Sequence, residues 1–273
     1  MPLLLADFHL HIYRTHQREL LIRALFANLA RLAAQIPTSS PPPILAAFLA
    51  DRRRSSLFRD WRRGLIRVLG CSARPADDLT LRLETQNGQS LFLFAGRQIT
   101  TREGLELLTL VSDNDIPDAL LFPKAVEMAL RDPGIPVIPW APGKWLGTRA
   151  SLVRQGLETL RSRHVLIADP AIRPAGLPDP PLFRQARRLD IPIVAGSDIY
   201  PFPGEEPLAG IYATLIEGTF EPEHPADSIR SLLQQRPLSL CRRIGRRSSF
   251  PAAIRRWLTH HIGFSSPEAA FSP

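Results

Sequence analysis

The sequence predicts a mostly parallel α/β fold in one domain, and three observations support this prediction. Apolar strands alternate with amphipathic helices through the second half of the chain, which implies parallel strands joined by helical crossovers. The 273 residues can bury a sizeable core, and 44% hydrophobic and 22% charged residues are typical of a globular chain. No internal repeat and no clear linker divides the chain. We therefore expect one domain over residues 1–264, followed by a flexible tail at residues 265–273.

The first part of the chain is predicted to be irregular. Residues 3–8 form a short apolar segment typical of a buried strand, and residues 17–35 have apolar side chains at helical spacing. Prolines between residues 37 and 43 end that helix, because proline lacks a backbone N–H donor. Two further helices are expected at residues 44–49 and 57–69, the second with arginines on its outer face.

A hairpin is predicted before the regular alternation begins. Asn87-Gly88 lies between two apolar segments at residues 79–85 and 90–95, and this dipeptide accepts the positive φ angles of a tight turn. Residues 105–111 are expected to form another strand.

In α/β folds the chemistry sits at the carboxyl ends of the strands. The later helices are expected at residues 119–130, 148–161, 182–189, 226–235 and 250–261, and the later strands at residues 135–139, 165–168 and 191–195.

The chain is basic, with a formal net charge of +8. Its lysines are Lys124 and Lys144, so 34 − 2 = 32 of the basic residues are arginine. A basic surface attracts phosphate groups, although a solvated face that stabilises helices explains the same arginines. No stacking aromatic residues are interleaved with the arginines, so we expect a small anionic substrate, with nucleic-acid binding by the arginine clusters as the weaker alternative.

Other features bound the location of the protein. No apolar run reaches the roughly 18 residues that span a bilayer, and the first residues lack a secretory signal. Cys71 and Cys241 do not form a disulfide framework or a CxxC motif. We therefore expect a cytoplasmic protein with no membrane partner, whereas the oligomeric state is not defined by the sequence.

Two histidines follow the first predicted strand. His9 and His11 alternate in Asp7-Phe8-His9-Leu10-His11, so in an extended chain both side chains share one face. Two imidazoles on one face form half of a zinc or manganese site. Two loop histidines without a metal ion are the alternative.

Asp198 follows the strand expected at residues 191–195, within Gly196-Ser197-Asp198. If that strand lies beside the first one, the carboxylate completes a His-His-Asp set with positions open for water. A helix or turn cap made by Ser197 or Asp198 is the alternative.

These motifs resemble those of the PHP family, which comprises polymerase-associated and histidinol-phosphatase-type phosphoesterases. Residues 7–11 resemble its first motif and residues 196–198 its last. Residues 96–100, Gly-Arg-Gln-Ile-Thr, resemble its Gly-x-Glu-Ile-Thr segment, and the resemblance extends over residues 1–220 in motif order. It implies a distorted TIM-like (β/α)7 barrel and a metal-dependent phosphoesterase.

The sequence departs from the family pattern at several ligand positions. Gln98 stands where the family has a metal-ligand glutamate, and Glu106 stands where a strand histidine is usual. Trp140 replaces the histidine of a His-Pro turn, and Tyr200 occupies the position of the last histidine. The family's Thr-Asp-His segment is missing before residue 90.

The resemblance therefore implies an incomplete metal site. His9, His11 and Asp198 would hold one divalent ion, zinc or manganese, or the chain would hold none. Asp198 and Glu106 are the candidate catalytic residues, with Glu106 as the general base. His16 is a possible helper of this set.

Several residues are predicted to bind the substrate. Arg97 and Arg102 flank the Gln98 segment, where they could clamp an anion bidentately. Lys144 lies in a stiff loop and binds phosphate or carboxylate as a point charge. Side chains that simply face solvent or pack are the alternative. The other predicted members of the mouth are Gln98, Trp140 and Tyr200, of which the aromatic pair suits stacking against a ring or sugar.

Two functions from different classes remain open. The first is a metal-dependent hydrolase, a phosphoesterase that acts on a small anionic substrate through a metal-activated water. The second is an inactive binding or regulatory protein on the same scaffold, because a fold does not dictate a function. His260-His261 ends the last predicted helix and is interpreted as a C-terminal charge pair rather than as ligands.

Overall fold

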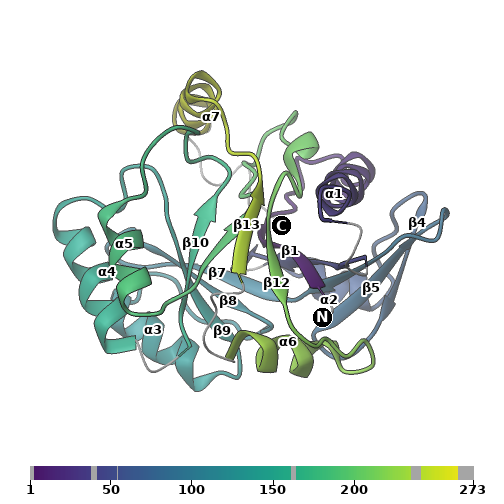
Figure 1. The fold of residues 1–273 in the computed structure, drawn as a ribbon, viewed down its shortest axis with the longest axis horizontal. Coiled ribbons are helices and arrows are strands. Elements are labelled where there is room, and N and C mark those ends of the chain that lie inside the picture. Colours follow the sequence, from purple (N-terminus) through teal and green to yellow (C-terminus); the bar gives the residue numbers. More distant parts are fainter. Residues whose placement is uncertain (1–2, 38–41, 54, 161–163, 235–240, 264–273) are drawn as a thin grey trace.

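The structure is a computed structural model, and it describes residues 3–37, 42–53, 55–160, 164–234 and 241–263. Its strands form two sheets (Figure 1). In spatial order, the seven-stranded sheet consists of β13 (Cys241–Gly245), β12 (Tyr212–Glu217), β1 (Leu3–Leu10), β2 (Ile44–Leu49), β6 (Ser90–Phe94), β5 (Thr80–Thr85) and β4 (Cys71–Pro75). The six-stranded sheet consists of β11 (Ile193–Gly196), β10 (Leu166–Pro170), β9 (Ile135–Pro139), β8 (Glu106–Leu110), β7 (Gly96–Thr100) and β3 (Asp51–Arg52).

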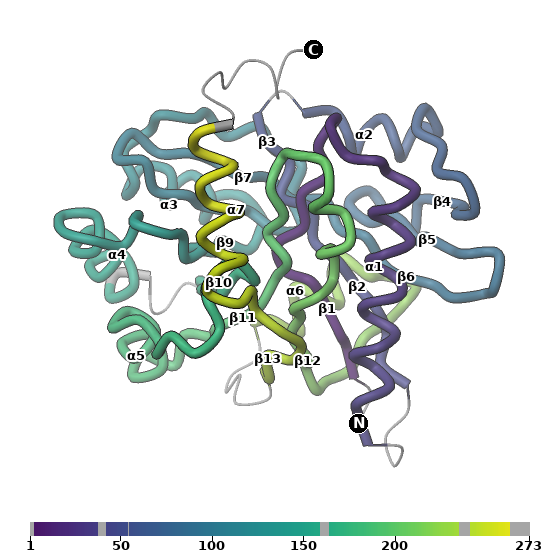
Figure 2. The backbone as a smooth tube through the Cα atoms, turned by 90° about the horizontal axis from the view of Figure 1, so that it is seen from above, coloured from purple at the N-terminus to yellow at the C-terminus, as the bar shows by residue number. Residues whose placement is uncertain are grey.

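The helices lie around the outside of the two sheets. They are α1 (Arg18–Ala33), α2 (Leu57–Arg62), α3 (Phe122–Arg131), α4 (Gly147–Leu160), α5 (Pro181–Arg188), α6 (Pro225–Gln234) and α7 (Phe250–Gly263), with a short 3-10 turn, η1, at Glu206–Leu208. Figure 1 shows α3, α4 and α5 together on one flank, α1 on the other, α6 below and α7 above. Seen from above in Figure 2, α7 crosses the centre of the molecule.

Most of the predicted elements are confirmed, but one of the early helices is a strand and another is shorter than predicted. Residues 44–49 form β2 instead of a helix. This run of six apolar residues is too short for its periodicity to distinguish a strand from a helix, and its position between β1 and β6 decides the outcome. The helix expected at residues 57–69 ends at Arg62, and Gly64 follows with a φ of 75°, a conformation typical of a helix stop.

The expectation of a mostly parallel fold is wrong. Of the eleven ladders among the described strands, six are antiparallel and five are parallel. β8 runs antiparallel to both β7 and β9, because the chain reverses in the turn at residues 101–105. β12 and β13, which the sequence did not reveal, add two more antiparallel ladders beside β1. Regular alternation holds from β9 to β11, where the ladders are parallel.

One buried core joins the two sheets. Phe8, Phe48 and Phe94 of the seven-stranded sheet stack in sequence, with ring centroids 4.5 and 4.8 Å apart. Val137 and Val194 of the six-stranded sheet pack into the same cluster, and α6 covers it from below. The inner faces of both sheets therefore face a common interior.

The sheets also meet where β11, an edge strand of the six-stranded sheet, lies beside the carboxyl end of β1, which is an interior strand of the other sheet. The Asp198 backbone N–H donates a hydrogen bond of 2.8 Å to the carbonyl of His9. A Cβ atom on Gly196 would lie 2.5 Å from the His9 backbone nitrogen, so only glycine permits this approach. The described strands nevertheless form two sheets and not one closed barrel. The α/β class is confirmed, while closure into a TIM-like ring is not.

Two further expectations concern the ends of the chain and membranes. The tail predicted at residues 265–273 lies outside the described residues. In the described ranges, no helix has the length and apolar character needed to cross a bilayer.

Candidate metal centre

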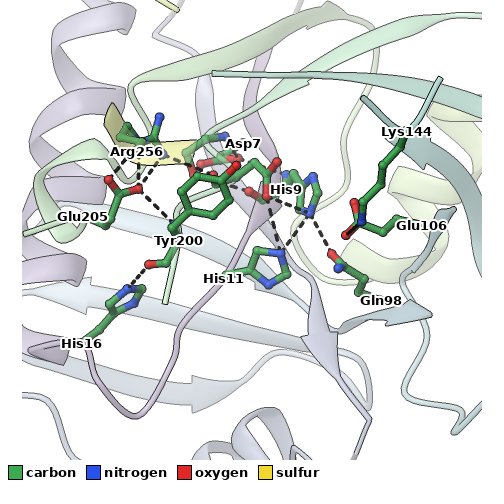
Figure 3. Close-up of polar contacts among 12 residues, drawn as sticks. Asp7, His9, His11, His16, Gln98, Glu106, Lys144, Tyr200, Glu205 and Arg256 are labelled. Carbon is green, nitrogen blue, oxygen red and sulfur yellow. Dashed lines mark hydrogen bonds and ion pairs between the residues drawn. The ribbon is translucent and has the colours of Figure 1, made fainter. Parts of the chain in front are cut away.

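Three predicted ligands lie close together, and Figure 3 shows two of them, His9 and His11, directed toward each other. His9 and His11 lie at the carboxyl end of β1, and Asp198 follows β11. Asp198 Oδ1 is 3.5 Å from His9 Nε2 and 3.7 Å from His11 Nε2. One ligand atom from each residue lies within 4.8 Å of the others. The contact between β1 and β11 thus brings together side chains that are far apart in sequence.

Gln98 adds a fourth polar atom to this group. Its Oε1 lies 3.1 Å from His9 Nε2, and His11 Nε2 lies at the same distance from that nitrogen. His9 Nε2 thus faces an amide oxygen, a carboxylate oxygen and a second imidazole, but a neutral imidazole has one N–H and cannot donate to all three. Ligands at about 2.0–2.1 Å from a tetrahedral zinc ion are about 3.3–3.4 Å apart. The four residues therefore fit a divalent ion.

Hydrogen bonds behind the ligands hold them in place. The Asp7 carboxylate accepts the backbone N–H groups of His9, Ser197 and Gly210 at 3.0, 2.9 and 3.1 Å, which ties β1 to the segment after β11. The His11 ring is hydrogen-bonded to the Ala50 backbone. Such a bond to the far side of a ring orients the other nitrogen toward a metal.

Burial shifts the pKa of two candidate ligands in opposite directions. Desolvation, to which the Coulombic effects of His9 and Arg52 add, keeps the pKa of His11 well below its usual range, so its lone pair is available. Desolvation also raises the pKa of Asp198. A bound dication reverses that effect by stabilising the carboxylate. Asp198 has a φ of 45°, a strained conformation of the kind found at functional sites.

A cavity of about 90 Å³ lies beside the ligand set. Glu106 and Lys144 line it and form an ion pair, with Nζ 2.7 Å from Oε1. Burial alone would raise the pKa of Glu106, but the charges of Lys144 and Arg52 outweigh it and lower the pKa. Arg52 lines the same cavity and is hydrogen-bonded to the side chain of Tyr13, whose pKa burial raises to about 12. At neutral pH the cavity therefore holds one carboxylate and two cations beside Asp198.

Helix α7 forms one wall of this cavity through Trp257, His260 and His261. The His260 ring stacks on Tyr200 with a centroid distance of 4.5 Å and an interplanar angle of 4°. Burial lowers the pKa of His260 to about 4, so the ring is neutral at physiological pH. The interpretation of this pair as a charged helix end is therefore wrong for His260, because the ring packs into the mouth of the site.

Helix α7 is fixed to the site by a buried ion pair between Arg256 and Glu205. Arg256 Nε donates to both Glu205 oxygens, at 2.8 and 3.0 Å. The guanidinium lies over the Tyr200 ring at 5.3 Å, and Glu205 accepts the Tyr200 backbone N–H at 3.0 Å. His16 donates from Nε2 to the Tyr200 carbonyl at 2.8 Å and accepts the Tyr13 N–H on Nδ1. His16 therefore positions the Tyr200 loop and is not a ligand.

Three predicted substrate-binding residues do not line the cavity. Arg97 is buried and donates to Asp113 Oδ1 and to the Ser55 carbonyl, both at 2.8 Å, so its charge is already bound. Arg102 is exposed, and Trp140 packs against the core under α3 to α5. Gln98, Lys144 and Tyr200 do line the cavity.

Sequence reasoning missed the contributions of β3 and α7. Arg52 is the first of three consecutive arginines, Arg52-Arg53-Arg54, and nothing in this run singles out the one that reaches the cavity. His260 and Trp257 are three residues apart, which places them on one face of a helix. That spacing was a usable signal, but the sequence did not show that this helix covers the site.

At the level of sequence, no family model and no curated protein matches this chain. Solved structures of similar fold include PsfC from Pseudomonas syringae, with 16% identity and a TM-score of 0.50 over 96% of this chain and 98% of that one. A two-domain protein from Bacteroides vulgatus that contains a predicted PHP-like metal-dependent phosphoesterase is 14% identical, with a TM-score of 0.50 over 89% of this chain and 65% of that chain. The lesion-specific endonuclease PfuEndoQ from Pyrococcus furiosus is 10% identical, with a TM-score of 0.51 over 98% of this chain and 68% of that one.

Identities this low establish the fold alone. The chain shares its fold with a PHP-like protein, so the resemblance that the short motifs indicated is confirmed for the fold. It spans 65% of the two-domain protein from Bacteroides vulgatus.

Proposed function

We propose that this chain is a metal-dependent hydrolase that cleaves phosphate esters of small anionic substrates. His9, His11 and Asp198 would hold one divalent ion, zinc or manganese, with the Gln98 amide oxygen as a fourth ligand. The meeting of these four polar groups around His9 Nε2 is the observation that carries the proposal. The likeness in fold to a protein with a predicted PHP-like metal-dependent phosphoesterase supports it, and we interpret the two sheets as the distorted barrel of that family.

The ligand set also fits the charge that such a reaction requires. Asp198 contributes one negative charge, while Gln98 and the two neutral imidazoles contribute none. A divalent ion would therefore keep a net positive charge, which favours an anionic substrate. When bound, the ion lowers the pKa of a water molecule and offsets the charge of the phosphoryl group.

The other residues of the cavity have complementary tasks. Lys144 and Arg52 supply two positive charges for the phosphoryl oxygens. Glu106 is ionised at neutral pH and is the proposed proton acceptor. A phosphate that engages Lys144 would weaken the hold of that lysine on Glu106 and so raise the pKa of the carboxyl. Tyr200 and His260 form a flat wall suited to the organic part of the substrate.

The experiment is a hydrolysis assay of the full chain with p-nitrophenyl phosphate and bis-p-nitrophenyl phosphate, with zinc or manganese added. Asp198→Ala should abolish turnover, because it removes the one charged ligand. Lys144→Gln should raise KM more than it lowers kcat, because it removes a substrate contact. His224→Ala is the matched control, since His224 is exposed and does not line the cavity.

The alternative is a binding protein without catalysis. It predicts that neither ester is hydrolysed with any divalent ion while the protein still binds phosphate in the cavity. Turnover that is equal in Asp198→Ala and in the unmodified chain would show that the activity does not arise at this centre.

A further inference from the structure

A second and larger cavity lies next to the candidate metal centre. It has a volume of about 430 Å³, within the range typical of small-molecule sites. Arg256 and Glu205 line it, and both contact Tyr200, which lines the metal-site cavity. The two cavities are thus neighbours separated by this ion pair and the Tyr200 loop.

The lining of this second cavity carries an excess of positive charge. Four arginines face one carboxylate, and Arg256 is already paired with Glu205. Arg246, Arg247 and Arg255 form no ion pair with any carboxylate in the described ranges. Three uncompensated charges around one concave surface attract an anion.

Hydrogen-bond donors are also left over in this cavity. Nη1 of Arg247 is buried, and among the described residues it has no hydrogen-bond partner. A buried donor without a partner raises the free energy of the protein, so a ligand oxygen that reached it would be bound favourably. Ser248 Oγ accepts from Arg256 Nη1 at 2.9 Å, which leaves its own hydroxyl proton to donate.

The remaining surface of the cavity is apolar. Leu208 lines it from the end of η1, Ile211 from the segment that follows, and Ala252 from the first turn of α7. A site of this size with donors at one side and an apolar floor suits a ligand that joins an anionic group to an organic body. A bare inorganic ion would leave most of the volume unused.

We propose that this second cavity binds a small organic phosphate, with its phosphate group held by Arg246, Arg247 and Arg255. The guanidinium groups match phosphate oxygens in geometry and charge. The apolar floor holds the organic part. This site is separate from the metal centre and does not require that the chain be a hydrolase.

The test is isothermal titration calorimetry of the full chain with phenylphosphonate, whose carbon–phosphorus bond a phosphoesterase does not cleave. Arg247→Gln and Arg255→Gln should each weaken binding about tenfold, since each removes charge-assisted hydrogen bonds. Arg255 is exposed on α7, so its replacement should leave the fold intact even if Arg247→Gln does not fold. Inorganic phosphate should bind more weakly than phenylphosphonate, because it lacks the organic part.

Two controls separate this site from general attraction and from the metal centre. Arg242→Gln makes the same change in net charge on exposed β13 outside the cavity and should leave the affinity unchanged. Lys144→Gln alters the metal-site cavity and should leave the affinity of the second cavity unchanged, although it weakens any phosphonate binding at the metal centre itself. The proposal is overturned if Arg255→Gln binds phenylphosphonate as tightly as the unmodified chain. It is overturned equally if Arg242→Gln weakens binding as much, or if only Lys144→Gln weakens it.

Discussion

Replacing Arg256 by methionine should destabilise the protein by about 3–5 kcal/mol, because it leaves a buried carboxylate without a partner. The side chains of Arg256 and Glu205 are 6% and 4% exposed. Arg256 donates to both Glu205 oxygens, to Ser248 Oγ and to the Asp198 carbonyl. Methionine fills a similar volume, so the loss comes from the charge and hydrogen bonds rather than from a cavity.

The assay is urea unfolding of a double-mutant cycle with Arg256→Met, Glu205→Gln and the double variant. The double variant should be less destabilised than the sum of the single variants, because it buries no unpaired charge. Arg255→Met on the exposed face of α7 is the control and should change stability by less than about 0.5 kcal/mol. A loss below about 1 kcal/mol in Arg256→Met, with no coupling to Glu205, would refute the role of this pair in fixing α7 over the site.

Three further predictions concern the electrostatics and packing of the site. Burial raises the pKa of Asp51 to about 6 from 3.8. Ionising this carboxyl therefore lowers the free energy of unfolding by about 2.2 × 1.36 ≈ 3 kcal/mol. This loss is complete above pH 6 and absent below pH 3.8. Asp51→Asn should therefore be more stable than the unmodified chain at pH 8 and equal to it near pH 4 in urea unfolding, and equal stability at both pH values would contradict this. Gln98→Glu places a second carboxylate about 3.1 Å from His9 Nε2, so zinc should bind at least about tenfold more tightly in a competition titration with a chelator. Unchanged zinc affinity would exclude Gln98 from the ligand set. Gly196→Ala puts a Cβ atom 2.5 Å from the His9 backbone nitrogen, so this variant should bind zinc more weakly than the unmodified chain. Gly88→Ala in the hairpin turn is the control and should leave zinc affinity unchanged. Equal zinc affinities of Gly196→Ala and the unmodified chain would show that the approach of β11 to β1 does not position His9.

The proximity of the three candidate ligands could be predicted because its signal is local. His9 and His11 follow an apolar strand and Asp198 follows another, and the carboxyl ends of such strands gather at one end of an α/β fold. The close approach of Gly196 to His9 realises that geometry. Gln98 is predicted from the sequence as a substrate contact, and its Oε1 lies 3.1 Å from His9 Nε2, which is the reason for proposing it as a fourth ligand.

The rest of the site depends on contacts that no local pattern encodes. β2 was taken for a helix, because six apolar residues do not reveal whether neighbours on both sides will be strands. Arg97 and Arg52 are both arginines at the ends of neighbouring strands, yet Asp113 binds Arg97 and the cavity receives Arg52. The sequence shows both charges but not which face of the sheet each reaches.

The central claim is that His9, His11, Gln98 and Asp198 hold one divalent ion. Anomalous X-ray diffraction at the zinc absorption edge, from crystals of the full chain grown with zinc, tests it most directly. We expect one strong peak within about 2.0–2.2 Å of His9 Nε2, His11 Nε2 and Asp198 Oδ1, and no peak there in Asp198→Ala. Zinc bound only elsewhere, or an identical peak in that variant, would contradict it.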